Sequence, residues 1–375
     1  MSNKKMNLHE KFGIPRIINA AGTITFYGGC RVRQSAAIAM AEASKDFIDL
    51  NALLENSGSY IANLLGVEAA LVTAGASPGI MLSVAACIAG TDPWLRNRLP
   101  SNPPQKRDII IMRCHRNPYD NAVPTAGGRF IEIGDAIKTH PWELENAIGP
   151  DTAAIFYALQ AEMLSASLSL DETIMIAHNK GIPVIVDAAA ELPPKKNLWD
   201  IAKRGADFVI FSGGKEIRGP QSSGLIVGKK LFIEAARYNG APFYGVGRPV
   251  KAGKENIAGF VAALEEYLSE DEEKHLKEMT DIRDNWITEL AKIPKIEAGI
   301  FLPTQPGMHP ICIPKAYVKL KNERMSAIKL QDLLRKQNPC ILVDIWKDVI
   351  VLNPQTIGSM QESIEIIKAI RAVIE

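Results

Sequence analysis

Residues 207–228 read DFVIFSGGKEIRGPQSSGLIVG, an apolar run followed by a small-residue turn that carries one lysine. The run Phe208 to Phe211 is typical of a strand buried on both faces of a parallel sheet. The Ser-Gly-Gly that follows lets the backbone approach a ligand closely. An ammonium group that leaves water there has a lowered pKa, so Lys215 becomes an amine able to form a Schiff base. A lysine that reaches out to solvent is the alternative for this segment taken alone.

A second apolar strand, within residues 181–194, ends in Asp187 and small residues. A buried carboxylate needs a cation or a donor, and the pyridinium nitrogen of pyridoxal 5'-phosphate is such a partner. A helix cap is the alternative role for this aspartate. The order strand-Asp187, helix, strand-Lys215 has the length of one strand–helix–strand unit and favours the cofactor.

A third segment, residues 68–79, predicts a phosphate site. A strand ending in Thr73 turns through Gly75, Ala76 and Ser77 into an apolar helix, with Pro78 in its first turn. Free backbone N–H groups and the helix dipole bind an anion there. The segment matches neither a Walker P-loop nor the Gly-x-Gly-x-x-Gly fingerprint.

Taken together, these segments resemble the fold-type I pyridoxal-phosphate enzymes, and within them the selenocysteine synthase-like group. That group includes L-seryl-tRNA(Sec) selenium transferase and D-glucosaminate-6-phosphate ammonia-lyase. The stretches that carry the resemblance are INAAGT (18–23), TAGA (73–76), CIAGTDP (87–93), HRNPYD (115–120), IVDA (185–188), FSGGK (211–215), GPQ (219–221) and GRP (247–249).

The resemblance implies an α/β fold-type I PLP-dependent transferase fold (aspartate aminotransferase-like), with a seven-stranded mostly parallel sheet and a smaller α+β carboxyl-terminal domain. It implies pyridoxal 5'-phosphate as the cofactor and Lys215 as the catalytic residue. The expected activity is that of a carbon–nitrogen lyase that removes an α-proton and releases ammonia and an α-keto acid from an amino acid or amino-sugar acid. Racemisation, β-replacement as in the selenium transferases, and a non-enzymatic PLP-binding regulatory role are the alternatives.

Three further residues are expected at the cofactor. In this family a residue of the loop that follows the strand 108–112 stacks on the cofactor ring, which implies His115, with Tyr119 as the alternative. Ser212, three residues before Lys215, is placed to donate its hydroxyl to the phosphate, or else to cap the turn. Gln221 matches the family's glutamine and is assigned to support of the cofactor site.

Capture of a substrate carboxylate is expected from arginine, whose planar fork matches it bidentately. The candidates are Arg31 and Arg248, both in Gly-rich segments that suit loops folding over a shared site, with Arg116 as a weaker third. Lys251 and Lys254 either reach a phosphate or form a solvated charge pair.

The composition of the chain argues against nucleic-acid-binding, membrane and metal-binding proteins. The 375 residues have a net charge of +1 and 47% hydrophobic content, so nothing points to nucleic acid or membrane. The selenium transferases carry an additional amino-terminal domain that helps to hold tRNA, whereas the shared core here begins near Phe12, which favours a small-molecule substrate. The five cysteines show no metal-like spacing, so no metal site is expected. With no signal-like segment, they indicate reduced thiols in a cytoplasmic protein. A homodimer or higher homo-oligomer is expected.

Together with the hydrophobic periodicity, the resemblance implies three segments, namely an amino-terminal part (1–30), a large PLP-binding domain (31–255), and a linking helix with a small carboxyl-terminal domain (256–375). One long helix is expected over 256–293, and a surface loop over 94–107. The expected strands are 69–73, 108–112, 129–133, 153–157, 183–187, 207–211 and 225–227 in the large domain, and 299–302, 311–313, 340–345 and 349–352 in the small one. Further helices are expected at 173–180, 198–204, 326–336 and 359–374.

Overall fold

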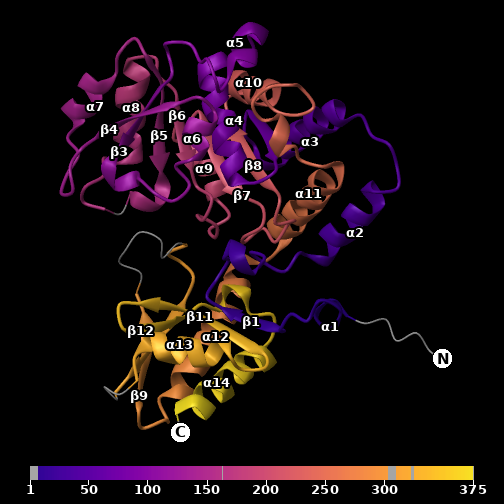
Figure 1. Cartoon of the computed structure of the whole chain (residues 1–375), viewed down its shortest axis with the longest axis vertical. Coiled ribbons are helices and arrows are strands. Elements are labelled where there is room, and N and C mark those ends of the chain that lie inside the picture. Colours follow the sequence, from indigo (N-terminus) through magenta and orange to yellow (C-terminus); the bar gives the residue numbers. More distant parts are fainter. Residues whose placement is uncertain (1–6, 163, 303–309, 322–324, 375) are drawn as a thin grey trace. The chain divides into compact units, whose positions relative to one another are not determined.

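The computed structural model describes residues 7–162, 164–302, 310–321 and 325–374. The chain divides into two compact units, shown in Figure 1. The large unit is built from Cys30 to Glu270, and the small unit combines the residues before Cys30 with most of the described residues after Glu270. Each unit has its own hydrophobic core.

A seven-stranded sheet, counted over the described residues, forms the centre of the large unit. Its strands run parallel except β8, which pairs antiparallel with both of its neighbours. The predicted mostly parallel sheet is confirmed, and so is the position of each of its seven strands to within a residue or two. In spatial order the strands are β2 (Ala69–Thr73), β8 (Gly224–Gly228), β7 (Phe208–Ser212), β6 (Val184–Asp187), β5 (Thr152–Ala158), β3 (Asp108–Met112) and β4 (Arg129–Ile133).

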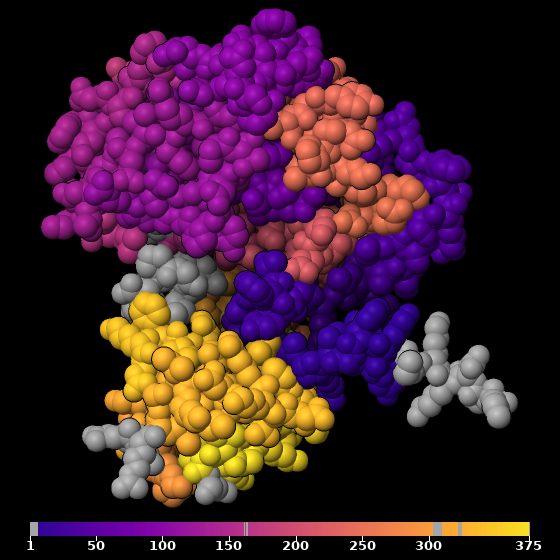
Figure 2. Space-filling model, in the orientation of Figure 1, coloured from indigo at the N-terminus to yellow at the C-terminus, as the bar shows by residue number. Residues whose placement is uncertain are grey.

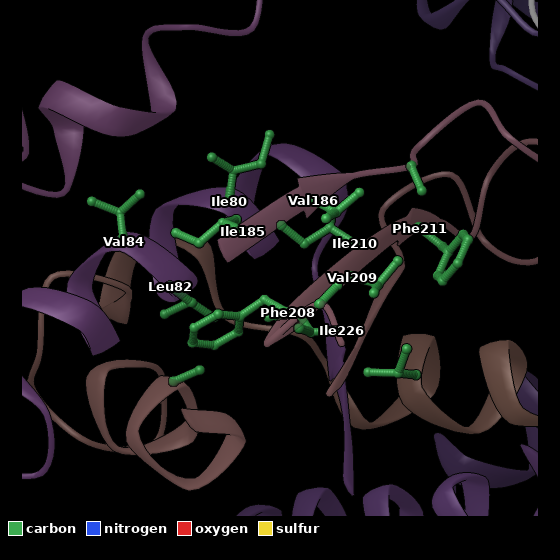
Figure 3. Close-up of a cluster of buried hydrophobic side chains, with 14 of the residues drawn as sticks. Ile80, Leu82, Val84, Ile185, Val186, Phe208, Val209, Ile210, Phe211 and Ile226 are labelled. Carbon is green, nitrogen blue, oxygen red and sulfur yellow. The ribbon is translucent and has the colours of Figure 1, made fainter. Parts of the chain in front are cut away.

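The central strands are apolar along their length because both of their faces are covered. Phe208 to Phe211 are fully buried. Helix α4 (Ala76–Ala89) packs on β2 and on β5 to β8, and α10 (Lys230–Asn239) packs on α4 in turn. Figure 3 shows side chains of α4 gathered with those of β6, β7 and β8. This packing fixes the strands, and with them the loops that follow.

The remaining helices of the large unit surround this centre. Helix α2 lies along α11, and Figure 2 shows the indigo and salmon segments that contain them side by side on one face. The predicted helices at 173–180 and 198–204 are confirmed as α8 and α9. These helices are α2 (Gln34–Ala43), α3 (Leu50–Leu65), α5 (Pro93–Arg98), α6 (Ala122–Thr125), α7 (Pro141–Ala147), α8 (Leu170–Asn179), α9 (Asn197–Lys203) and α11 (Lys254–Ser269).

The small unit holds a sheet in which five of the described strands pair in the order β1-β11-β12-β10-β9. Helices α12 to α14 pack on it, and Trp286 is fully buried in its core. The predicted helices at 326–336 and 359–374 are confirmed. The elements are α1 (Leu8–Phe12), β1 (Ile17–Ala20), α12 (Glu272–Leu290), β9 (Ile296–Phe301), β10 (Lys315–Leu320), α13 (Ala327–Arg335), β11 (Cys340–Trp346), β12 (Val349–Leu352) and α14 (Met360–Ile374).

Three local predictions were wrong. The helix expected over 256–293 is interrupted, because the Asp271 side chain accepts from the N–H of Lys274 and starts α12 as a new helix. The loop expected from 94 begins as helix α5, which Asp92 caps in the same way. Residues 311–313 form turns, and the strand lies at β10 instead. No helix in the described part of the chain is long and apolar enough to cross a lipid bilayer.

Candidate active site

Five neighbouring strands end in a row at one edge of the large sheet. Gly224 lies between Thr73 on β2 and Ser212 on β7, and Asp187 lies opposite Ala158 on β5. The carboxyl ends of parallel strands meet at one edge, where α/β proteins bind their ligands. The predicted phosphate segment, Ser212 and Asp187 are therefore brought to the same edge of the sheet.

Lys215 stands in the loop that joins β7 to β8. Because β8 runs antiparallel to β7, both ends of this loop are fixed in the sheet. The loop is tied across itself, since the N–H of Gly213 donates to the carbonyl of Ser223 and the N–H of Gly219 donates to the carbonyl of Gly213, both at 2.9 Å. A Cβ on Gly214 would lie 2.7 Å from Cα of Gln221, so only glycine fits that position. Lys215 thus extends from a constrained loop.

Lys215 and Asp187 form a charge cluster with a third group, Glu191. Burial lowers the pKa of Lys215, against the charges of Asp187 and Glu191. Burial likewise raises the pKa of Asp187, while the N–H of Ala189 (3.0 Å from Oδ1) and the charge of Lys215 act in the opposite direction. The charges of Asp187 and Lys215 therefore act on each other, in a setting that weakens the charge of each.

Glu191 is a site residue that the sequence reasoning missed. Its side chain is buried and its charge acts on both Asp187 and Lys215. The available signal was an acidic residue four positions after Asp187, at the end of an Ala-Ala-Ala turn that is too short to carry it back to solvent.

The amino terminus of α4 is where the sequence predicts an anion site. Gly75, with φ 147°, is the N-cap of a 14-residue helix that none of the described side chains caps. The N–H groups of its first turn, at Ala76 and Ser77, are therefore available to an anion. The hydroxyl of Thr73 donates to the Gly75 carbonyl at 2.8 Å and fixes the turn. The Ser77 side chain is exposed.

Gly224 lets the predicted phosphate loop, which contains Gly75, Ala76 and Ser77, lie close to the sheet. A Cβ at this position would lie 2.5 Å from the carbonyl carbon of Gly75. Gly224→Ala is therefore expected to push the loop outwards, at a cost of about 1–3 kcal/mol, and to weaken binding of pyridoxal 5'-phosphate in equilibrium dialysis. Gly149→Ala is the control, because a Cβ there meets no atom within 4 Å. Equal affinities for the two variants would show that the phosphate does not use this loop.

His115 follows β3 and is held at both ring nitrogens. Nδ1 accepts from the N–H of Ala158 at 3.0 Å, so the proton is on Nε2, which donates to the Ser167 hydroxyl at 2.8 Å. The ring contacts Tyr157 edge to face at 4.4 Å and is 1% exposed. His115 follows β3, the strand next to β5, so it lies near the row of strand ends. Its predicted stacking on the cofactor stays a prediction.

The burial of His115 gives stability a specific pH dependence. Burial lowers the pKa of His115 to about 4, from 6.5. The unfolded chain therefore takes up a proton first, and stability falls as the pH drops from 6.5 to 4. Between pH 7 and pH 4 the free energy of unfolding in urea is expected to fall by about 3 kcal/mol more in the wild type than in His115→Gln. Equal losses would show that His115 titrates normally.

Of the other predicted residues, Ser212 and Gln221 lie at or in the loop that carries Lys215. Ser212 ends β7 and is half-buried, whereas Gln221 and Tyr119 are exposed. The carbonyl of Arg31 accepts from Nε of Arg218 at 3.2 Å, so its backbone adjoins this loop while its side chain is exposed.

The remaining cations have other partners. Arg248 is exposed and lies over the Tyr244 ring, and Arg116 is paired with Asp120 and Glu132. Lys254 donates to the carbonyl of Ala43 and pairs with Glu255, and Lys251 is exposed. Among the described residues no group of acidic, cysteine and histidine side chains could hold a metal ion.

A lysine after β7 and an aspartate after β6, beside a glycine-led helix start, define the class of fold-type I pyridoxal-phosphate enzymes. Comparison with known proteins narrows the class. The profile of the L-seryl-tRNA selenium transferase family matches residues 114–299. A D-glucosaminate-6-phosphate ammonia lyase of Salmonella typhimurium is 34% identical over 266 residues, 70% of each chain. The chain belongs to the selenocysteine synthase-like family.

Two further relatives agree with this assignment. A 5'-C-glycyluridine monooxygenase-decarboxylase of a Streptomyces species is 33% identical over 297 residues, 77% of this chain and 72% of the relative. The solved structure of a D-glucosaminate-6-phosphate ammonia-lyase superposes with a TM-score of 0.82 at 27% identity, over 99% of this chain and 100% of that one. The family resemblance seen in the sequence is confirmed.

Proposed function

We propose that this chain is a PLP-dependent ammonia-lyase that acts on a small amino acid or amino-sugar acid and releases ammonia and an α-keto acid by β-elimination. The observation that carries the proposal is that Lys215 and Asp187, both half-buried, follow or end neighbouring strands of the sheet and act on each other's pKa. The 34% identity to an enzyme named as an ammonia lyase supports the reaction type.

The residues present fit the cofactor. A half-buried lysine and a half-buried carboxylate whose charges act on each other suit its aldehyde and its ring nitrogen, and the first turn of α4 suits its phosphate. Lys215 would hold the aldehyde carbon, Asp187 the ring N–H, and Gly75, Ala76 and Ser77 the phosphate, with help from Ser212. His115 would lie against the ring face, and Gln221 would support the site from the far side of the lysine loop.

Bound pyridoxal phosphate supplies an electron sink for the negative charge left on the substrate's α-carbon. Asp187, as a carboxylate, would keep a proton on the ring nitrogen and so maintain that sink. Lys215, once the substrate amine has taken its place, would accept the α-proton at Nζ, which its lowered pKa favours. Arg31 or Arg248 would hold the substrate carboxylate.

Substrate screening tests the proposal. Purified protein loaded with the cofactor is incubated with amino acids and amino-sugar acids, and the keto acid, the ammonia and the optical purity of residual substrate are measured. Release of keto acid and ammonia in equal amounts is the expected result. Loss of optical purity alone would identify a racemase, and a yellow protein that turns over no substrate would identify a binding protein.

A second candidate reaction follows from the relative named a monooxygenase-decarboxylase, whose identity to this chain is almost the same. A decarboxylating enzyme would release carbon dioxide in place of the β-substituent. Measuring carbon dioxide in the same screen separates the two reactions.

Assembly is part of the proposal, and we expect at least a homodimer. Large apolar side chains of the large unit are exposed on α2, α3 and the segment between them, which is unusual for a surface that stays in water. They are Ile38, Phe47, Ile48, Tyr60 and Leu64. Phe47→Glu is expected to weaken the dimer in light scattering, whereas Leu231→Glu, exposed elsewhere, leaves it intact. An active monomer of the wild-type chain would contradict a site shared between subunits.

The other partners proposed are small molecules, with no nucleic acid and no membrane, and the location proposed is the cytoplasm. The near-neutral net charge and the five cysteines without paired spacing support these assignments.

A further inference from the structure

The two loops that carry Asp187 and Lys215 are anchored to the same turn, the carboxyl end of α11. This turn, Glu266 to Glu270, lies outside the row of strand ends. One buried arginine, Arg33, connects it to the Lys215 loop, and one lysine, Lys195, connects it to the loop that follows Asp187.

Arg33 contacts the Lys215 loop through two hydrogen bonds. Its Nε donates to the carbonyl of Ile217 at 2.8 Å, and its backbone N–H donates to the carbonyl of Arg218 at 2.9 Å. These carbonyls lie two and three residues after Lys215. Arg218 also has the positive φ of 57° that is rare outside glycine, so the chain turns sharply where Arg33 holds it.

The same guanidinium is bound on its other side by two carboxylates. Both terminal nitrogens of Arg33 donate to Glu270, with Nη2 to Oε2 at 2.9 Å, and Nη1 also donates to Glu266 at 3.1 Å. Burial acts to lower the pKa of Arg33, but the hydrogen bonds and charge of Glu270, and then of Glu266, outweigh it and raise that pKa. The side chain is only 2% exposed, so its charge is retained in the interior by these partners.

Lys195 ties the neighbouring loop to the same turn. Its Nζ donates to the carbonyls of Leu268 and Glu270. Both cations also lie over the ring of Tyr267, Arg33 at 5.8 Å and Lys195 at 5.3 Å from its centroid. The Lys215 loop and the loop that follows Asp187 are therefore both held by the carboxyl end of α11.

We propose that Arg33 is a positioning residue for Lys215, which holds the lysine loop against the end of α11 and thereby fixes the position of the amine. A planar fork is needed because one side chain must satisfy a carbonyl and two carboxylates at once, which an ammonium group cannot do in one plane. The catalytic consequence rests on the proposed function, whereas the restraint on the loop does not.

Hydrogen exchange on the cofactor-free protein tests the restraint directly. In Arg33→Met the amides of residues 213–223 are expected to exchange about tenfold faster. The side-chain bonds of Arg33 are absent in this variant, so a local opening of the loop no longer has to break them and costs less free energy. Residues 152–158 of β5 serve as the reference and are expected to keep the wild-type rate. Arg33→Lys, which keeps the charge and loses the fork, is expected to lie between.

Two further variants complete the design. Glu270→Gln removes the carboxylate charge that pairs with Arg33 but leaves the backbone carbonyl to which Lys195 donates. It is therefore expected to speed exchange in the Lys215 loop, and it provides this test even if Arg33→Met does not fold. Arg129→Met removes another arginine bound to a carboxylate through two nitrogens, that of Asp108 at 2.7 and 2.9 Å on β3. This control is expected to leave the Lys215 loop at the wild-type rate.

The outcomes are distinct. Faster exchange confined to the loop supports the proposal, and it does so even if the protein binds no pyridoxal phosphate, in which case only the proposed function fails. Exchange that rises equally in β5 shows a general stabilising role and overturns the proposal. An unchanged loop in both Arg33→Met and Glu270→Gln overturns it as well, even in a protein that binds the cofactor normally.

Discussion

Lys215→Ala is expected to remove the visible absorption of the loaded protein and to lower turnover by at least about 10²- to 10⁴-fold, the contribution of one positioned general base. The fold is expected to survive, since Lys215 lies in a loop whose ends are fixed by β7 and β8. The cofactor-free variant should unfold at no lower urea concentration than wild type, because a buried amine with a lowered pKa costs stability.

Borohydride reduction followed by peptide mapping identifies the lysine. The reduced cofactor is expected on Lys215, and the exposed Lys196 serves as the control, because Lys196→Ala should leave colour and turnover unchanged. A label on Lys195, Lys229 or any other lysine would refute the assignment.

Asp187→Asn is expected to reduce kcat by about 10²- to 10³-fold while the cofactor is retained. The amide oxygen of asparagine can still accept from the N–H of Ala189, so the turn after β6 is preserved. The phosphate loop and Lys215 are untouched, and only the carboxylate that keeps a proton on the ring nitrogen is lost. Turnover is compared with cofactor content measured after release by alkali.

Unimpaired turnover in Asp187→Asn would mean that Asp187 does not contact the ring nitrogen. Loss of the cofactor in parallel with turnover would instead show that Asp187 acts mainly in binding. The second result would transfer the role in chemistry to the neighbouring carboxylate, Glu191.

Much of the large unit could be predicted because its strands are buried on both faces. Runs such as Asp108 to Met112 and Phe208 to Phe211 have no amphipathic alternative, and most of the intervals between the strands hold helical patterns. The break between α11 and α12 was missed because it depends on a single capping aspartate, Asp271, inside a continuous helical pattern. Strand β10 was missed although Ala316 and Val318 are buried on either side of the half-buried Tyr317, since lysines flank them.

The site residues could be predicted where the cofactor chemistry requires one particular residue type. Lys215 and Asp187 are brought into one cluster as expected, because each follows a buried strand. Glu191 and Arg33 could not be found in this way. Arg33 depends on partners far away in the sequence, such as Glu270, and a single sequence contains no record of such pairs. Glu191 lies only four positions after Asp187, but its charge also acts on Lys215, 24 positions further on.

The parallel pairing of β1 with β11 has a consequence for synthesis of the protein. It joins Ile17 to Cys340, so the first strand of the small unit must wait for its partner until nearly the whole chain has been translated. Residues 30–270 have their own sheet and core and can fold on the ribosome before then. A chain released before Cys340 would carry a folded large unit beside an unpaired strand edge, the kind of surface that recruits other chains into aggregates.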